Sequence, residues 1–193
     1  MTLLIIGLVI FLGIHSVRIV AEGWRAAQIA RVGPNAWKLG YSVLSALGLA
    51  LVIWGFGLAR QAPIVLWHPP TGMRHAAALL TLIAFIFVAA AYVPRNHLKA
   101  RFHHPMVLGV KAWAAGHLLA NGTVADVLLF GSFLAWAVVA FIAARKRDRR
   151  AGTTYASGTA TGTLITVVAG TVAWAAFAFW LHGVLIGVKP FGV

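Results

Sequence analysis

Polar side chains at helical spacing lie within stretches of this sequence that are otherwise strongly apolar. In RFHHPMVLGVKAWAAGHLLANG, His104 and Lys111 are seven residues apart and would share one face of an α-helix. Trp113, His117 and Asn121 follow one another at intervals of four and would share a second face. Ionisable groups within strongly apolar helices usually face the interior of a helix bundle and mark function. These two faces are therefore the first candidates for a functional site.

A third polar stripe lies near the N-terminus. His15, Arg18 and Glu22 are spaced by three and four residues, so they share one helical face. Arg18 and Glu22 can form an i,i+4 ion pair, which lowers the free-energy cost of placing both charges near lipid. The alternative is that the stripe only anchors a helix at the membrane surface.

The chemistry open to these residues is mainly that of the imidazole ring. Neutral histidine is the commonest protein ligand for metal ions and an axial ligand of haem iron. His15 and His117 could bind iron from opposite sides of a haem that lies between the helices of a bundle. The residues that would surround this cofactor are His104, Lys111, Arg18, Trp113 and Asn121. The first three are basic and could meet its propionates. The alternative is that both histidines only hydrogen-bond neighbouring helices.

The composition indicates a membrane protein that crosses the bilayer several times. Of the 193 residues, 61% are hydrophobic and only 10% are charged, whereas a soluble domain averages about 25% charged residues. The chain contains no cysteine, which excludes disulfides, cysteine metal ligands and thiol catalysis. The opening MTLLIIGLVIFLGIHSVRIV has no basic start and no small-residue cleavage site, so it predicts a permanent span and not a signal peptide.

The predicted fold class is all-α, a polytopic membrane helix bundle. Runs of about 20 apolar residues can cross a hydrocarbon core about 30 Å thick, and backbone groups inside it must be paired within a helix. Gly48, Gly55 and Gly57 predict close helix packing, and Pro105 suits the first turn of a helix. We expect one domain over residues 1–193 with about six transmembrane helices, at 2–20, 39–59, 76–93, 105–120, 124–144 and 163–187.

Lys and Arg residues gather in alternate connections between these spans and set the orientation. Eleven lie in the first, third and fifth connections, and only Arg60, Arg74 and Lys189 lie on the other side. By the positive-inside rule both termini face outward, to the periplasm. The segment 151–163, rich in Gly, Thr and Ala, is then expected to be a flexible cytoplasmic loop. In such a protein the net charge of +13 indicates contact with membrane lipid and not with nucleic acid.

Several polar residues outside the stripes have structural explanations. His97 and His103 lie in the basic third connection and are expected to be solvated. Asp126 is expected to cap the N-terminus of the fifth span or to pair with a neighbour.

Four segments that follow one another along the chain resemble the NnrU family. They are GIHSVRI (13–19), GLALVIWGFGLAR (48–60), HHPMVLGVKAWAAGHLLANG (103–122) and LLFGSFLAWAV (128–138). The combination of His-Pro, Trp and HLLANG carries the resemblance. The family commonly continues Asn-Gly-Asp, whereas Thr123 follows Asn121-Gly122 here and the acid is displaced to Asp126, so no role of that carboxylate is carried over.

The resemblance implies a cofactor and two roles. NnrU proteins are linked to the nitric-oxide response and to denitrification in bacteria, which implies a multi-pass protein of the inner membrane. The family is similar to plant 15-cis-zeta-carotene isomerase, a membrane enzyme that uses haem b with two histidine ligands. By this resemblance His15 and His117 are the axial ligands and His104 supports the site. The role is either nitrogen-oxide metabolism or, as in a haem-dependent isomerase, cis–trans isomerisation of a polyene such as a carotenoid.

Two further functions stay open at the level of sequence. HHPMVLG resembles the Arg-His-Pro-x-Tyr-x-Gly stretch of isoprenylcysteine-type membrane methyltransferases, with His103 and Val107 in place of the Arg and the Tyr. Alternatively, the protein is a non-catalytic assembly factor that binds a nitrogen-oxide reductase and needs no cofactor.

Overall fold

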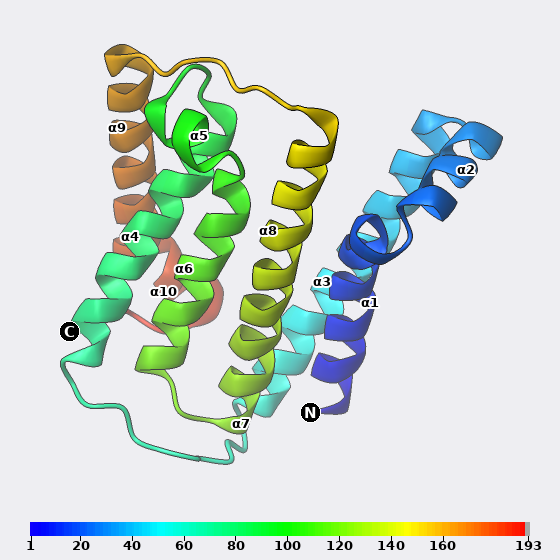
Figure 1. Ribbon diagram of the computed structural model, residues 1–193. Coiled ribbons are helices and arrows are strands. Elements are labelled where there is room, and N and C mark those ends of the chain that lie inside the picture. The colour runs from blue at the N-terminus through cyan, green and yellow to red at the C-terminus, as the bar shows by residue number, and fades with distance from the viewer. Residues whose placement is uncertain (192–193) are drawn as a thin grey trace. The chain divides into compact units, whose positions relative to one another are not determined.

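The computed structural model describes residues 1–191, and these are almost entirely helical (Figure 1). The only strand-like pairing in that part of the chain is one isolated bridge between Val65 and Thr123. The predicted all-α class is therefore confirmed. The chain forms two compact units: unit 1 comprises Met1–Trp67 and Gly122–Ala140, and unit 2 comprises His68–Asn121 and the chain from Phe141 on. Each unit is described by itself.

Among residues 1–191, five helices are long and apolar enough to cross a membrane. Three of them are α1 (Thr2–Val20), α3 (Pro34–Ala59) and α4 (Met73–Tyr92). The other two are continuous composites: α7 (Val124–Asp126), η1 (Val127–Gly131) and α8 (Ser132–Ala151), then α9 (Ala160–Ala176), η2 (Phe177–Leu181) and α10 (His182–Ile186). The remaining predicted span is α6 (Pro105–Ala120), whose 16 residues extend about 24 Å. The protein is a multi-pass membrane protein.

Large apolar side chains remain exposed along these spanning helices. Leu39 and Ile53 on α3, Val172 on α9 and Trp180 on η2 each expose more than 60% of their surface. A soluble protein rarely leaves so much contiguous apolar surface in water. Lipid contact accounts for this exposure.

In unit 1, α1 and α3 pack antiparallel at backbone distance, as Figure 1 shows. A Cβ added at Gly7 would lie 2.5 Å from the backbone nitrogen of Val52, and one added at Gly48 would lie 2.8 Å from that of Phe11. Gly55 meets the backbone of α1 in the same way, so close packing at Gly48 and Gly55 is confirmed. The prediction for Gly57 is wrong, because no atom lies within 4 Å of a Cβ built there.

A short helix, α2 (Glu22–Val32), connects α1 to α3 in unit 1. Gly33 ends α2 with φ at +84°, a conformation that glycine adopts without strain, and Pro34 begins α3. The prolyl ring occupies the first helical turn, where an N–H has no partner in the helix.

The other end of unit 1 is joined by backbone hydrogen bonds. The amides of Leu66 and Trp67 donate to Gly122 O at 2.8 and 3.2 Å, and Val124 N donates to Ile64 O at 2.9 Å. The loop after α3 and the start of α7 therefore lie together.

Asp126 completes a capping box at the start of α7. Its carboxylate accepts from Thr123 N at 2.9 Å, while Thr123 Oγ1 accepts from Asp126 N at 3.3 Å. The capping role predicted for Asp126 is confirmed.

In unit 2, α4 packs against both α6 and α9 (Figure 1). Small residues again allow close approach: a Cβ at Gly109 would lie 2.9 Å from Ala84 O, and one at Gly170 would lie 2.6 Å from Ile86 Cα. Pro105 is in the first turn of α6, as predicted. The short helix α5 (His97–Phe102) precedes α6, and Asn96 caps it by accepting from Lys99 N at 2.7 Å.

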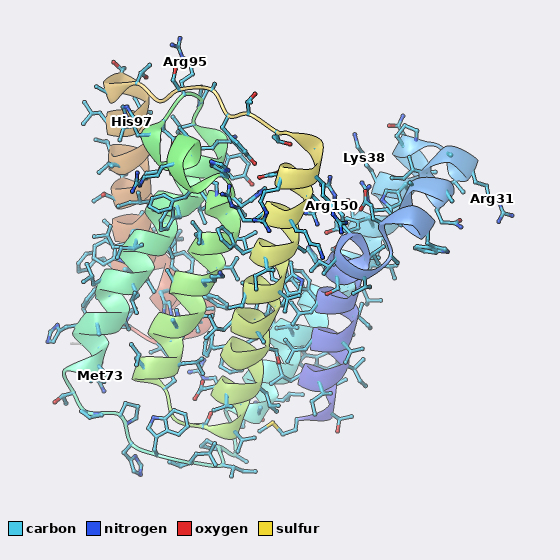
Figure 2. All side chains as sticks on the ribbon, in the orientation of Figure 1. Arg31, Lys38, Met73, Arg95, His97 and Arg150 are labelled. Carbon is cyan, nitrogen blue, oxygen red and sulfur yellow. The ribbon has the colours of Figure 1, made fainter. Side chains whose placement is uncertain are left out.

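The connection before α9 is attached to the turn before α5. Thr159 N donates to Arg95 O at 2.7 Å, and Thr163 Oγ1 lies 2.7 Å from His97 Nδ1. Figure 2 shows His97 beside the N-terminal end of α9. The connections before α6 and before α9 therefore lie at one end of unit 2. The predicted loop 151–163 is too long at its C-terminal end, because residues from Ala160 on form α9. The single domain over 1–193 and the flexibility of the loop stay predictions.

We predict that Gly48→Ala lowers the free energy of unfolding by about 1–3 kcal/mol, because the new methyl group would press on the backbone of α1. The matched control on the same helix is Gly57→Ala, which adds a methyl group in open space and changes stability by less than about 1 kcal/mol. Thermal unfolding of detergent-solubilised protein, followed by circular dichroism, measures both. Equal stability of the two variants would contradict the close packing at Gly48.

Candidate functional site

His15 of α1 is oriented by its own helix. Its Nδ1 lies 2.6 Å from Phe11 O, one turn earlier. A carbonyl oxygen can only accept, so Nδ1 carries the proton and Nε2 carries the lone pair of the neutral ring. An Nδ1–H bonded to a backbone carbonyl is the usual support of a histidine that binds metal through Nε2.

Aromatic rings surround His15 within unit 1. The ring centroids of Phe11, Tyr41 and Trp136 lie 4.2, 5.3 and 6.0 Å from that of His15. The indole Nε1 of Trp136 is buried and has no hydrogen-bond partner in the described part of the chain. The imidazole thus sits in an aromatic, weakly polar environment that can hold a flat apolar ligand.

An apolar groove borders Trp136. It has a volume of about 440 Å³. It is lined by Leu8, Val9, Leu12, Gly13, Ser16, Ile19 and Val20 of α1 and by Ser132, Ala135, Trp136 and Val139 of α8. The hydroxyl of Ser16 donates to Leu12 O at 2.6 Å, so its polarity is satisfied by the helix. The groove therefore offers space for apolar atoms next to the aromatic residues around His15.

Arg18 is at the surface end of the same stripe. Its Nε lies 3.6 Å from a carboxylate oxygen of Glu22, and both side chains are largely exposed, by 59% and 44%. Arg25 pairs with the other oxygen of Glu22 at 3.2 Å. The predicted i,i+4 pair is confirmed, and the role of Arg18 beside a cofactor stays a prediction.

In unit 2, His117 of α6 has the same arrangement as His15 has in unit 1. Its Nδ1 lies 2.9 Å from Trp113 O, one turn earlier, and the two rings are 5.2 Å apart. Asn121 ends the helix and donates from Nδ2 to His117 O at 2.8 Å. The three residues of this predicted face are therefore together, with His117 in the tautomer that carries its lone pair on Nε2.

His104 and Lys111, predicted to share a face of α6, both lie beside Phe141 of α8, and the ring centroids of His104 and Phe141 are 6.2 Å apart. His104 is the N-cap residue, and its Nε2 lies 2.8 Å from Asp148 Oδ2 on α8. Lys111 has its ammonium 4.3 Å from the ring centroid of Phe141, a cation–π contact.

Asp148 is at the centre of a polar cluster that the sequence did not reveal. It accepts from Tyr155 OH at 2.9 Å as well as from His104, and only 14% of its side chain is exposed. The cluster joins the start of α6, the end of α8 and the connection that follows it. The signal in the sequence was a single acid inside the basic run RKRDRR.

The surroundings of His103 correct the prediction that it is solvated, which is wrong. Its ring stacks on Tyr155 with centroids 4.2 Å apart, and its Nδ1 accepts from the Arg145 guanidinium. Its side chain is only 24% exposed. The aromatic ring of Tyr155 and the charged side chain of Arg145, both distant in sequence, explain this burial.

Tyr155 stays protonated in this cluster. Burial and the neighbouring Asp148 carboxylate raise the pKa of Tyr155 to about 12. The stabilising O–H donor is therefore present below that pH and is lost only as the pH rises through it.

The described residues contain no group of three or more His, Asp or Glu side chains that could hold a metal ion. A haem iron would need only two ligands from the protein. The Nε2 lone pairs of His15 and His117 fit that requirement by their chemistry. His15 and Arg18 belong to unit 1, and His104, Lys111, Trp113, His117 and Asn121 belong to unit 2. The pairing of the two histidines stays a prediction.

We predict that Asp148→Ala lowers the free energy of unfolding by about 1–3 kcal/mol, because His104 and Tyr155 both lose their acceptor. Tyr155→Phe removes only one of these bonds and should cost about 1 kcal/mol. Arg150→Ala is the control on the same helix, because Arg150 is exposed. Circular dichroism during heating in detergent ranks the three. Equal stability of the Asp148 and Arg150 variants would contradict the cluster.

Comparison with known proteins identifies the family. No curated protein and no solved structure matches the chain. A family model described as NnrU protein matches residues 3–190, nearly the whole chain. The matched range therefore includes His15, His117 and Asp148 with their surroundings. The chain belongs to the NnrU family.

Proposed function

We propose that this protein binds haem b through His15 and His117 in the membrane. The observation that carries the proposal is that the two imidazoles have the same tautomer and the same local hydrogen bond. Each has its Nδ1 within hydrogen-bond distance of the carbonyl one turn earlier, which places the lone pair on Nε2. Both lie on helices with apolar sequences, where a ligand has little competition from water.

The surroundings of each histidine support the same ligand. Phe11, Tyr41 and Trp136 around His15, and Trp113 beside His117, are flat apolar rings that can pack on a porphyrin. Lys111 and Arg18 are the cations proposed to meet the propionates. His104 is held by Asp148, so we assign it the positioning of the first turn of α6.

Haem would supply redox chemistry when bound, and nitric oxide could reach its iron only after one of the two histidines leaves. The chain itself would orient the two imidazoles and exclude water with its aromatic rings. Membership of the NnrU family favours a role in nitrogen-oxide metabolism in a bacterial inner membrane. The apolar groove beside Trp136 also suits a polyene, so isomerisation of such a substrate is the second candidate function.

We predict that the full-length protein, extracted in detergent and supplied with haem, shows a Soret band that shifts on reduction with dithionite. His15→Ala and His117→Ala should each lower the haem retained per protein by at least about tenfold, because each would remove one of the two proposed iron ligands. The measurement is the absorption spectrum normalised to protein.

The matched control is His75→Ala, which removes an exposed histidine at the start of α4 and should retain haem. A wild-type protein that binds no haem would overturn the proposal. Loss of haem in all three variants alike would also do so. Two additions then distinguish the functions. A spectral change when nitric oxide is added to the reduced protein tests the role in nitrogen-oxide metabolism. Conversion of an added cis-polyene, followed by chromatography, tests isomerisation.

We also propose that α6 is a sixth span and that both termini face outward. The backbone bonds of Ile64, Leu66 and Trp67 to residues 122–124 support one membrane side for the connections before and after the α4–α6 pair. The bonds of Arg95 and His97 to Thr159 and Thr163 support the opposite side for the connections before α6 and before α9. The basic residues make that opposite side cytoplasmic.

Single cysteines test this topology without background, because the chain has none of its own. We predict that Thr2→Cys and Thr71→Cys react with a membrane-impermeant maleimide in intact cells, whereas Ser157→Cys reacts only after the membrane is opened. Labelling of Ser157→Cys from outside would show that α6 does not cross, since the chain would then reach residue 157 on the outer side.

A further inference from the structure

A small groove lies on the end of α8 in unit 2. It has a volume of about 350 Å³ and is lined by Phe141, Ile142, Arg145 and Arg149. Phe141, Arg145 and Arg149 are four residues apart, so they form one stripe, and Ile142 lies about 100° from Phe141 around the helix axis. The groove thus changes along the helix from apolar residues to two guanidinium groups one turn apart.

The positive charges in this groove are balanced only in part from within the protein. The protein has three acidic residues, and the only one in unit 2 is Asp148. That carboxylate accepts hydrogen bonds from His104 and Tyr155 and also interacts electrostatically with Arg145. Arg145 donates to His103 Nδ1, and Arg149 forms no ion pair with any residue between 1 and 191. An anion from outside the protein is therefore the natural partner.

The position of the groove selects the kind of anion. α8 ends one of the membrane-spanning helices, and Ile142 exposes 59% of its surface. Two arginines side by side match the oxygens of a phosphate group, which guanidinium binds in a forked geometry. A ligand that places phosphate beside arginine and hydrocarbon beside Phe141 and Ile142 is amphipathic.

We infer that this end of α8 is a binding site for an anionic phospholipid. Its phosphate lies between Arg145 and Arg149, and an acyl chain follows Phe141 and Ile142 toward the bilayer interior. The site fixes the level of α8 at the membrane surface through a specific lipid instead of through diffuse attraction.

The test uses the full-length protein in detergent and native mass spectrometry. Dioleoyl phosphatidylglycerol is compared with dioleoyl phosphatidylcholine, and the fraction of protein that carries one lipid is measured. We expect the wild type to bind the anionic lipid preferentially. Arg149→Gln should reduce that binding about fivefold, since each cation near an anionic surface contributes about that factor.

Arg150→Gln is the matched control, because it removes the same charge one residue along the helix, about 100° around the helix axis from Arg149. It should retain binding within about twofold. Equal losses in the two variants would show diffuse attraction and overturn the site.

Two further measurements keep the test decisive. Arg149→Lys retains the positive charge, so it should bind more lipid than Arg149→Gln. Such a difference would show that Arg149→Gln loses binding through charge and not through misfolding. Equal binding by the two variants would contradict the site. Excess inorganic phosphate should leave the lipid bound. Displacement by phosphate alone would assign the groove to a free anion and overturn the lipid proposal.

Discussion

A polar group inside a bilayer has to find its partner within the protein, because hydrocarbon offers none. Several side chains in this chain meet that condition with the carbonyl one turn earlier on their own helix. His15, Ser16 and His117 all do so, and Thr166 donates to Gly162 O at 2.7 Å. For a hydroxyl this only satisfies the group. For an imidazole it also selects the tautomer and the direction of the ring.

That local bond connects membrane physics to the proposed chemistry. A histidine placed to satisfy its own Nδ1–H presents Nε2 to whatever lies beside the helix. Close helix packing then holds the ring in position. Gly7 and Gly48 bring α1 and α3 to backbone contact in unit 1, and Gly116, next to His117, lies against Leu80 of α4 in unit 2. Small residues and fixed tautomers together hold both imidazoles in defined positions.

The scarcity of carboxylates organises the ends of the helices. The chain has three acidic residues against 16 Lys and Arg, and each acid has a defined structural partner. Glu22 pairs with Arg18 and Arg25, Asp126 closes a capping box, and Asp148 joins His104 to Tyr155. Because these three carboxylates already have partners, the remaining Lys and Arg side chains need anions from outside the protein to neutralise their charge. In a membrane protein, anionic lipid is the nearest source of that balance.

The sequence by itself determined the all-α class, five of the six predicted membrane-spanning segments and the faces that carry His15, Arg18, Trp113, His117 and Asn121. These depend on composition and on a helical period, which act over a few residues. The same period placed His104 and Lys111 on one face, but tertiary structure decided their partners. His104 meets Asp148 across 44 residues of chain, and His103 meets Tyr155 and Arg145 where solvation was expected. Gly57 shows the same limit, because a close approach depends on the neighbouring helix, and helical period carries no information about which residue of another helix lies opposite.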